Sequence, residues 1–560
     1  MWALAVSLVA GVLHGFSMAW PAFAFGDALG ISGQASGALQ GFSLVVLAAL
    51  LLQLASQETQ KKAWLQGAVA AGLFATSAMA STWGWLYISM HRYGGLPSWL
   101  SALAVLLLAG ALSVYFAAAA GIWVSLFRRW LLNARQTEGR AAMQHHGAFG
   151  RELRQGLVAA CLFASLWTLA ELCRGQLLTG FPWGASGYAH ADSWLAIYLP
   201  WLGVYGVGAV SAWIGMALPM GLSQWMAHRS TAWRWTTGAA LVLAVLLPAA
   251  LQISGTHFSA TAGQMTVRLL QGNIPQDEKF IPGQGVRMAL NWYSEQLMAN
   301  TETLVVSPET AIPVLPQQLP SSYWQTLQDK YTAKTAHPQL ALLGLPMGSQ
   351  DAGFRNSVMA MGDAKPEGQL PYRYDKQHLV PFGEFVPPFF KWFVRLMNMP
   401  LGDFAQDSPA PTVLTWQGQR LLPQICYEDL FGEEIAPYFA NESQAPTVLV
   451  NMSNLAWFGD STAMSQHVAI SRIRAMEFQR PVIRATNTGL TALIDAQGLV
   501  QAALPAFSRG SLVGVFEGRT GLTPYAHWTS RWGLFPLWLI CGVFVLVFGA
   551  ISRRSGSRAL

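Results

Sequence analysis

Long uncharged apolar stretches dominate residues 1–253 and recur once close to the C-terminus. A helix that crosses a bilayer needs about 20 mostly apolar residues. Only 11% of the 560 residues are charged, whereas ordinary soluble domains carry about 25%. A single soluble globule is therefore excluded, and so is a disordered chain, which needs low hydrophobicity and high charge. The sequence predicts a multi-pass α-helical membrane part, with seven spans and then an eighth after residue 532, at 2–19, 38–55, 64–89, 98–126, 153–172, 194–221, 235–253 and 533–551.

The basic residues are distributed unevenly over the loops between these spans. Loops rich in Lys and Arg face the cytoplasm. The loops after the second, fourth and sixth spans and the C-terminal tail carry Lys61, Lys62, Arg128, Arg129, Arg135, Arg140, Arg151, Arg154, Arg229, Arg234, Arg553, Arg554 and Arg558. The short loops on the other side hold only Arg92 and Arg174. We expect both termini in the cytoplasm and residues 254–532 on the opposite side. The net charge of +6 then reflects topology rather than nucleic-acid binding.

The ends of the spans leave some alternatives open. Residues 1–24 could be a cleaved signal peptide, but they lack a positively charged start, so we expect a retained first helix. Glu171, Arg174 and Asp192 lie near span ends, where we expect snorkelling or an ion pair. The aromatic-rich loop 173–194 is consistent with an interfacial belt or with the wall of a lipid-access groove.

Residues 254–532 mix charges, prolines and short apolar runs, as a globular domain does. Runs typical of β-strands occur at 266–270, 304–306, 340–344, 357–361, 421–426, 447–451, 482–485, 491–494 and 512–516. Helical patterns lie between several of them, at 284–300, 320–335 and 463–479. This alternation predicts an α/β domain with a layered sheet core. The expected domains are therefore 1–253, 254–532 and 533–560.

Four cysteines in 560 residues exclude a disulfide-rich scaffold, and only Cys426 lies in the globular part. Cys161, Cys173 and Cys541 lie in or beside membrane spans, where Cys behaves as a small apolar residue. Cys426 ends a predicted strand, and a helix is expected to begin near Leu430. A helix N-terminus would favour the thiolate, so we expect a reactive Cys426; the alternative is a buried core cysteine.

Other common site types are missing from the sequence. There is no G-x-S-x-G, no H-E-x-x-H, no cysteine–histidine cluster with zinc spacing and no phosphate-binding glycine loop. A nucleophilic cysteine needs a base and a group that stabilises an oxyanion. Glu309 follows the predicted strand 304–306, and Lys376 and Glu384 precede a Pro-rich apolar loop. Each of these charges, taken alone, is also consistent with a solvated surface residue.

Three motifs, in this order, resemble the nitrilase or carbon–nitrogen hydrolase superfamily. They are P-E-x-A at 308–311, K-x-H-L-V-P-F-G-E at 376–384 and I-C-Y-E at 425–428. Further matching segments lie at 271–276, 457–459, 472–481, 486–489 and 521–525. Seven spans before such a domain and one after it are similar to its membrane-embedded branch, the apolipoprotein N-acyltransferases. The resemblance covers essentially the whole chain.

The resemblance implies an α-β-β-α sandwich, with its core at about 265–517, and a Glu-Lys-Cys triad. Glu309 matches the general base, Lys376 the triad lysine and Cys426 the nucleophile. Supporting roles fall to Glu384, Tyr427 and Glu428. The sequence departs from the family pattern at Phe280, where Trp is common, and at Leu455, where Asp is common.

A dense apolar segment follows Glu384, and we expect it to form a mobile lid over a lipid entrance. Its residues are Phe385, Pro387, Phe389, Phe390 and Trp392. Phe280 and Trp457 are further candidates for lipid access.

The implied reaction transfers an acyl chain from a phospholipid to the α-amino group of a diacylglyceryl-cysteine on an apolipoprotein, through a thioester. The implied partners are the phospholipid donor, the diacylated acceptor and the bilayer, with no cofactor, metal or nucleic acid. The implied location is a bacterial inner membrane, with the catalytic domain in the periplasm. The alternatives are a membrane-tethered amidase that hydrolyses a small amide, a catalytically inactive sensor or scaffold, and a transporter.

Overall fold

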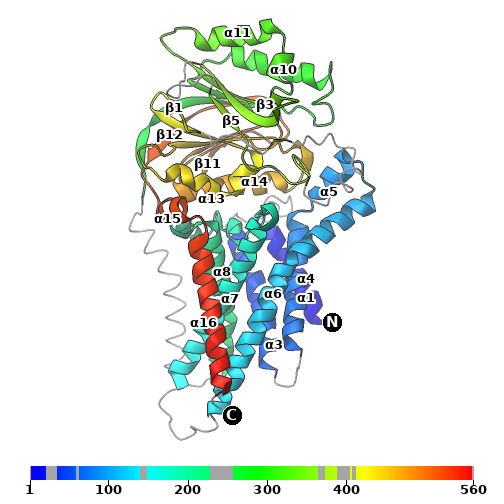
Figure 1. Ribbon diagram of the computed structural model, residues 1–560, viewed down its shortest axis with the longest axis vertical. Helices are drawn as coiled ribbons and strands as arrows, with labels where there is room; N and C mark the ends of the chain where they lie inside the picture. Colours follow the sequence, from blue (N-terminus) through cyan, green and yellow to red (C-terminus); the bar gives the residue numbers. More distant parts are fainter. Residues whose placement is uncertain are drawn as a thin grey trace. The chain divides into compact units, whose positions relative to one another are not determined.

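The computed structural model describes residues 2–19, 35–57, 62–138, 148–227, 257–362, 372–386, 404–405 and 412–557. The chain forms two compact units, and each is assembled from separated stretches of sequence (Figure 1). The first unit comprises Met1–Gly84, Ala102–Thr256 and Leu534–Leu560. The second unit comprises Trp85–Ser101 and His257–Gly533.

Apolar helices build the first unit. Within the described ranges, six helical segments are long and apolar enough to cross a membrane. They belong to α3 (Ala35–Ser56), α4 (Ala63–Thr82), α6 (Ser98–Glu138), α7 (Ala148–Gln176), α8 (Leu199–Ala227) and α16 (Phe535–Ser557). The predicted multi-pass membrane architecture is therefore confirmed. The predicted first span is the shorter helix α1 (Trp2–Ser17), and the predicted span 235–253 lies outside the described residues.

Small residues allow α1 and α4 to pack closely. A Cβ atom added at Gly11 would lie 2.1 Å from the Phe74 carbonyl oxygen, and one at Gly15 would lie 2.4 Å from that of Ala78. Any larger side chain at these two glycines would separate the helices. Such close backbone approach is how helices associate in a bilayer, where burial of apolar surface gives little driving force.

The loop between α7 and α8 is anchored by buried charges rather than by snorkelling ones. Glu171 and Arg174 are only 1% and 2% exposed. Glu171 accepts hydrogen bonds from the Ser186 main chain and hydroxyl at 2.7 and 2.6 Å, and Arg174 donates to the Trp183 carbonyl at 3.0 Å. The aromatic ring of Trp183 is itself buried. Snorkelling is thus wrong for both charges, since water cannot reach them and the loop supplies their partners instead. The other expected arrangement, an ion pair, stays a prediction.

The described residues of the second unit form two six-stranded sheets (Figure 1). The first has the order β12-β1-β2-β3-β4-β5, from Gly510–Thr520, Ala260–Gln271, Leu304–Val306, Leu340–Ser349, Gly353–Met361 and Arg373–Asp375. The second has the order β11-β10-β9-β8-β7-β6, from Val500–Ala503, Ala492–Ile494, Val482–Thr486, Val448–Ser453, Gln419–Ile425 and Leu414–Trp416. In each sheet three neighbouring strands are parallel to one another: β1, β2 and β3 in the first sheet, and β9, β8 and β7 in the second.

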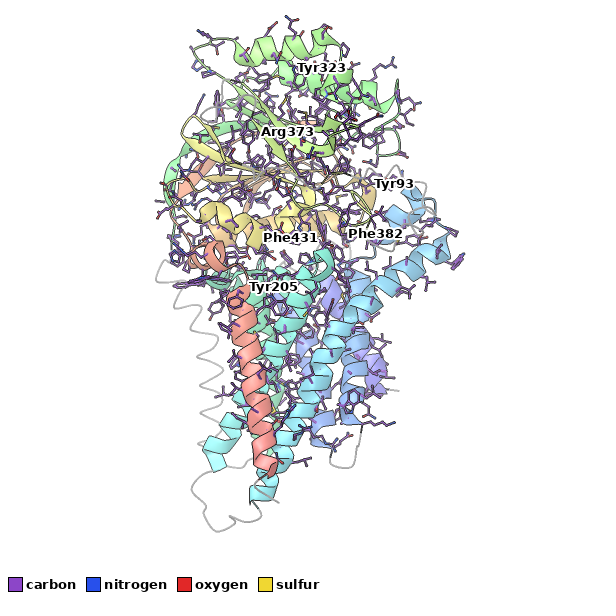
Figure 2. The ribbon with its side chains drawn as sticks, in the orientation of Figure 1. Tyr93, Tyr205, Tyr323, Arg373, Phe382 and Phe431 are labelled. Atoms are coloured by element: carbon purple, nitrogen blue, oxygen red, sulfur yellow. The ribbon has the colours of Figure 1, made fainter. Side chains whose placement is uncertain are left out.

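Alternating side chains hold this unit in four layers. In β2, Leu304 and Val306 join the core between the two sheets, whereas Val305 faces the outer helices. Helices α10 (Gly285–Met298) and α11 (Ser321–Thr332) cover the first sheet, and α14 (Ala463–Phe478) and α15 (Pro524–Trp532) cover the second (Figure 1). Side chains fill the space between the layers (Figure 2). The predicted α-β-β-α sandwich is confirmed.

A stretch between two membrane helices packs as part of the second unit. It contains α5 (Leu86–Ile88) and a short π-helix at Ser89–Tyr93. Tyr93 donates from its hydroxyl to the Ala456 carbonyl at 3.1 Å, and Ser89 to that of Trp457 at 2.7 Å. The Trp85 ring centroid lies 4.2 Å from that of Phe458. The loop after β8 is therefore held from outside by residues that directly follow a membrane helix.

Candidate active site

The ends of three strands deliver the predicted triad. Glu309 follows β2 in the first sheet, Lys376 follows β5 in the same sheet, and Cys426 follows β7 in the second. Carboxyl ends of parallel strands are the usual place for functional side chains in α/β folds. Cys426 itself has a φ of 54°, and Thr310 and Phe382 also have positive φ. Left-handed backbone is unfavourable for such residues and is concentrated at functional sites.

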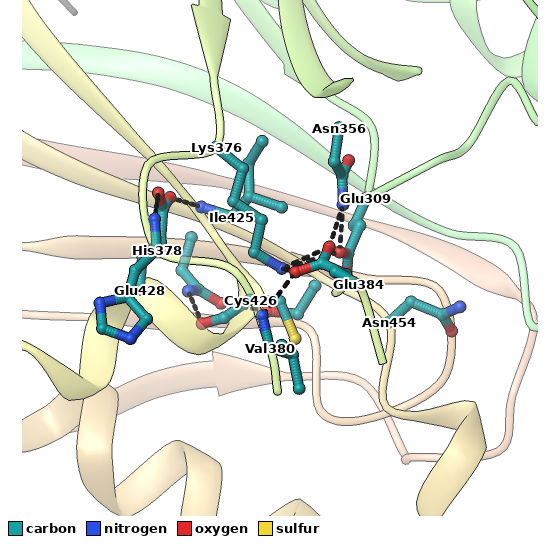
Figure 3. A network of polar contacts seen from close by, with 12 residues as sticks. Glu309, Asn356, Lys376, His378, Val380, Glu384, Ile425, Cys426, Glu428 and Asn454 are labelled. Atoms are coloured by element: carbon teal, nitrogen blue, oxygen red, sulfur yellow. Dashed lines mark hydrogen bonds and ion pairs between the residues drawn. The ribbon is translucent and has the colours of Figure 1, made fainter. Parts of the chain in front are cut away.

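Two carboxylates surround the buried Lys376 ammonium (Figure 3). The Lys376 Nζ lies 2.9 Å from a carboxylate oxygen of Glu384 and 3.4 Å from Oε1 of Glu309. Asn356 joins the two acids, because its Nδ2 donates to Glu309 at 2.7 Å and to Glu384 at 3.0 Å. The Val380 N–H donates to the other oxygen of Glu384 at 2.9 Å. The sequence-predicted Glu309, Lys376 and Glu384 thus form one polar cluster.

The charges of this cluster set the ionisation of the lysine and the thiol. Burial alone would lower the pKa of Lys376, but Glu384 and Glu309 outweigh it and raise that pKa above its ordinary value. Burial and the Glu309 charge raise the pKa of Cys426 well above its ordinary value, against the opposing effect of Lys376. At neutral pH the lysine is therefore a cation and the resting thiol keeps its proton, so a thiol that acts as the predicted nucleophile needs a base.

The expectation that a helix N-terminus favours the Cys426 thiolate is wrong. Cys426–Leu430 is a short 3-10 turn, followed only by the four-residue helix α13 (Gly432–Ile435). Such a short element has little macrodipole, because the dipole sums over aligned peptide groups. The Asn454 main-chain N–H does hydrogen-bond to the thiol and lowers the pKa, but burial and Glu309 dominate.

Glu428 connects the Cys426 turn to the loop that follows Lys376. Its Oε2 accepts from the Ile425 N–H at 2.6 Å and from the Tyr374 hydroxyl at 2.8 Å. Its Oε1 accepts from the main chains of Gln377 at 2.5 Å and His378 at 3.2 Å. One buried carboxylate therefore fixes the segments on both sides of the site.

Tyr427 is buried beside this connection. Its ring lies 5.2 Å from that of Phe431 and 5.5 Å from that of His378, measured between centroids. The Tyr427 side chain thus packs away from solvent, and its main-chain N–H follows directly after Cys426, the predicted nucleophile.

Glu428→Gln should change how the stability of the protein depends on pH. Burial raises the pKa of Glu428 to about 7, and hydrogen bonds to the carboxylate and the Lys376 charge offset only part of this shift. A raised carboxyl pKa means that the folded state binds a proton which the unfolded chain releases. Protonation of Glu428 therefore favours folding at low pH, and this contribution to stability is lost as the pH rises through about 7. Glutamine cannot titrate. The difference in unfolding temperature between wild type and variant should therefore shrink from about pH 5 to 7; a constant difference in thermal unfolding scans would contradict this assignment.

Two residues of the cluster were missed by the sequence analysis. Asn356 lies in β4 and Lys279 in the loop after β1, and neither belongs to a local motif. The Lys279 ammonium is buried and donates to the Glu309 carbonyl at 3.3 Å. Burial lowers the pKa of Lys279 to about 8, although Glu309 opposes the shift. Their role depends on contacts between distant strands, which sequence spacing alone does not reveal.

The structure describes three of the candidate lipid-access residues. Phe280 is 46% exposed, and Phe385 and Trp457 are partly buried. The Trp457 ring packs edge-on against Tyr93, with centroids 5.4 Å apart. Pro387, Phe389, Phe390 and Trp392 lie outside the described residues.

Comparisons with known proteins agree with this architecture. The family model described as carbon–nitrogen hydrolase matches residues 266–523, which places the two-sheet unit in that superfamily. The model described as the apolipoprotein N-acyltransferase N-terminal domain matches residues 28–217.

Relatives match nearly the full length of the chain. The apolipoprotein N-acyltransferase of Verminephrobacter eiseniae is 45% identical over 95% of this chain and 94% of its own length. That of Ralstonia nicotianae is 41% identical over 93% and 90%, and that of Nitrosomonas europaea is 33% identical over 98% and 99%. The chain belongs to the apolipoprotein N-acyltransferase family. The predicted family is confirmed, which disfavours the alternative of a small-amide hydrolase.

Proposed function

We propose that the protein transfers an acyl chain from a phospholipid to the α-amino group of the diacylglyceryl-cysteine of apolipoproteins. One observation carries the proposed chemistry: the thiol of Cys426 lies in the field of a buried Lys376 ammonium paired with Glu309 and Glu384. This arrangement, in a chain of the acyltransferase family with many membrane helices, suits covalent acyl transfer between two lipid-bound substrates.

In the first half-reaction, Cys426 attacks the ester carbonyl of the phospholipid. Glu309 accepts the thiol proton as the carbon–sulfur bond forms. A base is needed at this step because the raised pKa keeps the thiol protonated. Lys376 stabilises the negative charge on the tetrahedral oxygen, with the Tyr427 main-chain N–H as a second donor. The carbon–oxygen bond then breaks. The leaving alkoxide takes the proton from Glu309 and departs as lysophospholipid.

In the second half-reaction, the α-amine of the acceptor attacks the thioester. Glu309 takes a proton from the amine as the carbon–nitrogen bond forms. The carbon–sulfur bond breaks, and the Cys426 thiolate recovers the proton from Glu309. The products are the N-acylated lipoprotein and the original enzyme, so the cycle is ping-pong.

The supporting residues act through position. Glu384 holds the Lys376 ammonium at 2.9 Å, and Asn356 holds Glu384 and Glu309 beside each other. Glu428 fixes the turn at Ile425 against Gln377. Effective catalysis needs reacting groups held near their final geometry, so each of these contacts lowers the cost of reaching the transition state.

The membrane part suits substrates that are themselves lipid-anchored. Each buried CH₂ group contributes about 0.8 kcal/mol to membrane binding, so extracting either substrate into water would be costly. The uneven distribution of basic loops supports the proposal that both termini lie in the cytoplasm and the catalytic unit in the periplasm, at the inner membrane of a bacterium. The reaction would then occur where both substrates reside.

Phe280→Ala should weaken use of the phospholipid more than it slows chemistry. Phe280 is 46% exposed and its ring lies 5.9 Å from the Lys279 ammonium, so it offers an apolar surface next to the cluster. We expect KM for phospholipid to rise about 5- to 20-fold, in line with the burial of one aromatic ring, and kcat to change less than about 3-fold. Phe507→Ala is the matched control, because Phe507 is similarly exposed, at 45%. An unchanged KM for phospholipid in steady-state assays would remove Phe280 from the lipid-access group.

A transfer assay tests the proposed function. Purified protein in detergent is incubated with phosphatidylethanolamine and a diacylglyceryl-cysteine peptide, and the masses of the products are measured by mass spectrometry. We expect the peptide to gain one acyl chain and lysophospholipid to appear in equal amount. A peptide with an acetylated N-terminus is the control and should gain nothing. Release of free fatty acid without peptide acylation, or hydrolysis of small amides instead, would contradict the proposal.

A further inference from the structure

A buried polar cluster lies behind Cys426, and the proposed reaction uses none of it. Its members are Asp429 in the turn after the nucleophile, Asn451 in β8, Arg484 in β9, and His467 and Ser471 in α14. Each is at most 1% exposed. Buried charges are retained at a cost in free energy unless they are fully paired, so such a cluster beside a nucleophile calls for an explanation.

The sheet register explains how the cluster forms. Asn451 and Arg484 are direct neighbours on the parallel strands β8 and β9. Their flanking residues Val450, Met452 and Ile483 point into the core between the sheets. Alternation along a strand therefore turns Asn451 and Arg484 to the opposite face, which α14 covers.

Two members hold the main chain of the nucleophile. Asn451 donates from Nδ2 to the Cys426 carbonyl at 3.4 Å, and His467 also hydrogen-bonds to the Cys426 main chain. Cys426 has a φ of 54°. A non-glycine residue in this left-handed region costs about 1–2 kcal/mol, so the conformation persists only where surrounding contacts enforce it.

The remaining contacts fix the protonation of His467. The Arg484 guanidinium donates to the His467 Nδ1, and arginine has no lone pair to accept in return. Nδ1 must therefore be unprotonated, and the neutral ring carries its proton on Nε2. That atom lies 3.1 Å from Oδ1 of Asp429, and its proton is the one that the neutral ring can donate to the Cys426 main chain. Burial and the Arg484 charge lower the pKa of His467, which agrees with a neutral ring.

Further hydrogen bonds link the other members of the cluster. Arg484 donates to the Asn451 Oδ1 at 3.1 Å and to the Ser471 Oγ at 2.8 Å, and Ser471 donates to Oδ2 of Asp429 at 2.7 Å. Arg484 thus orients both groups that hold the Cys426 main chain, namely Asn451 and His467. Asp429 supplies the negative charge that the buried guanidinium needs, at 3.7 Å.

We infer that Arg484, through His467 and Asn451, is a positioning residue that locks the left-handed turn of Cys426. Holding this turn aims the Cys426 thiol at the base and the Tyr427 N–H at the developing oxyanion. Without the lock, Cys426 would relax toward an ordinary backbone conformation and displace both groups. The inference deepens the proposed function and rests on its nucleophile.

A matched pair of variants separates positioning from stability. Arg480 is also fully buried, but it donates to the main-chain carbonyls of Pro446 and Gly521. Arg484→Met and Arg480→Met therefore remove the same charge from equally buried sites, and both should lower the unfolding temperature. Only Arg484→Met removes contacts to His467 and Asn451, the two side chains that hold the Cys426 main chain.

The measurement is the pre-steady-state burst of p-nitrophenol from p-nitrophenyl butyrate, with the intact protein in detergent. This ester needs neither phospholipid nor acceptor. We expect Arg484→Met to slow the burst about 10- to 100-fold, the effect of displacing a reacting group by about 1 Å, with KM changed less than about 2-fold. Arg480→Met should burst at the wild-type rate. An equal slowing in both variants, or a raised KM with an unchanged burst rate, would overturn the inference.

Two further variants keep the test decisive if Arg484→Met fails to fold. His467→Gln retains a donor and an acceptor, whereas His467→Leu has neither. We expect the glutamine variant to stay within about 5-fold of the wild-type burst rate and the leucine variant to be slowed about 10- to 100-fold. Equal rates for the two would contradict the inference. If the wild-type protein shows the p-nitrophenol burst but does not turn over phospholipid, the result would count against the proposed function and not against this inference.

Discussion

Cys426→Ala should abolish acyl transfer while leaving the fold intact. The thiol supplies the only bond to the acyl group in the proposed mechanism, so we expect at least about a 10⁴-fold loss of kcat. The turn is held through its main chain by Glu428, Asn451 and His467, not by the Cys426 side chain. Transfer of labelled acyl chain to a diacylated peptide measures the loss, and circular dichroism checks the fold.

Two other cysteine variants serve as controls for this result. Cys173→Ala should retain activity, because Cys173 lies in α7 of the first unit. Cys426→Ser should remain nearly inactive, because an alcohol is far less acidic than a thiol and the site already raises the pKa of its nucleophile. Substantial transfer by the serine variant would mean that deprotonation is not the step for which Glu309 is needed.

Lys376→Met should remove most activity and also destabilise the protein in a pH-dependent way. The ammonium would no longer stabilise the oxyanion, and loss of one such group costs about 10²- to 10³-fold in kcat. It would also leave Glu309 and Glu384 buried together around Asn356 without a cation. Breaking a buried ion pair by removing one partner costs about 3–5 kcal/mol.

The pH dependence gives this second prediction a distinct signature. The raised pKa of Lys376 means that its stabilising charge is present at all pH values below its usual range and is lost only at still higher pH, so wild type should show no change from this group near neutrality. In the variant, one carboxylate can regain stability only by taking up a proton. Thermal unfolding should therefore show a larger deficit at about pH 8 than at about pH 5.

The Lys376→Arg variant separates the two roles of the lysine. It keeps a positive charge between Glu309 and Glu384, so most of the lost stability should return. The planar guanidinium group of arginine, however, presents its N–H donors in a different geometry. We expect activity to remain about 10-fold or more below wild type. A deficit in Lys376→Met that is independent of pH would contradict the assignment of Lys376 as the partner of the two carboxylates.

The sequence predicted the main strands, and it also marked the candidate triad residues, because both leave local signals. Apolar runs mark the buried strands, and Glu309, Lys376 and Cys426 each stand in a short motif. The strands β5, β6 and β11 were missed, because each is three or four residues long and lies at the edge of its sheet. Short edge strands bury little and carry no clear alternation.

The parts of the site that escaped prediction depend on contacts between distant segments. Asn356 bridges Glu309 and Glu384 only because β4 lies in the same sheet as β2. Arg484 faces α14 only because β9 pairs with β8 in one register. The ionisation of Cys426 also depends on such contacts, since burial and the Glu309 charge raise the pKa of its thiol. Sequence spacing cannot supply this information, because a shift of one residue in register would turn each side chain to the other face.

The measurement that tests the central claim most directly is intact mass spectrometry of the protein after brief incubation with phosphatidylethanolamine and no acceptor. The account predicts an added acyl chain on Cys426, in a thioester that hydroxylamine cleaves and that a diacylglyceryl-cysteine peptide discharges with gain of an amide. The adduct should be absent from Cys426→Ala. An acyl group on another residue, or full transfer to the peptide by Cys426→Ala, would contradict the account.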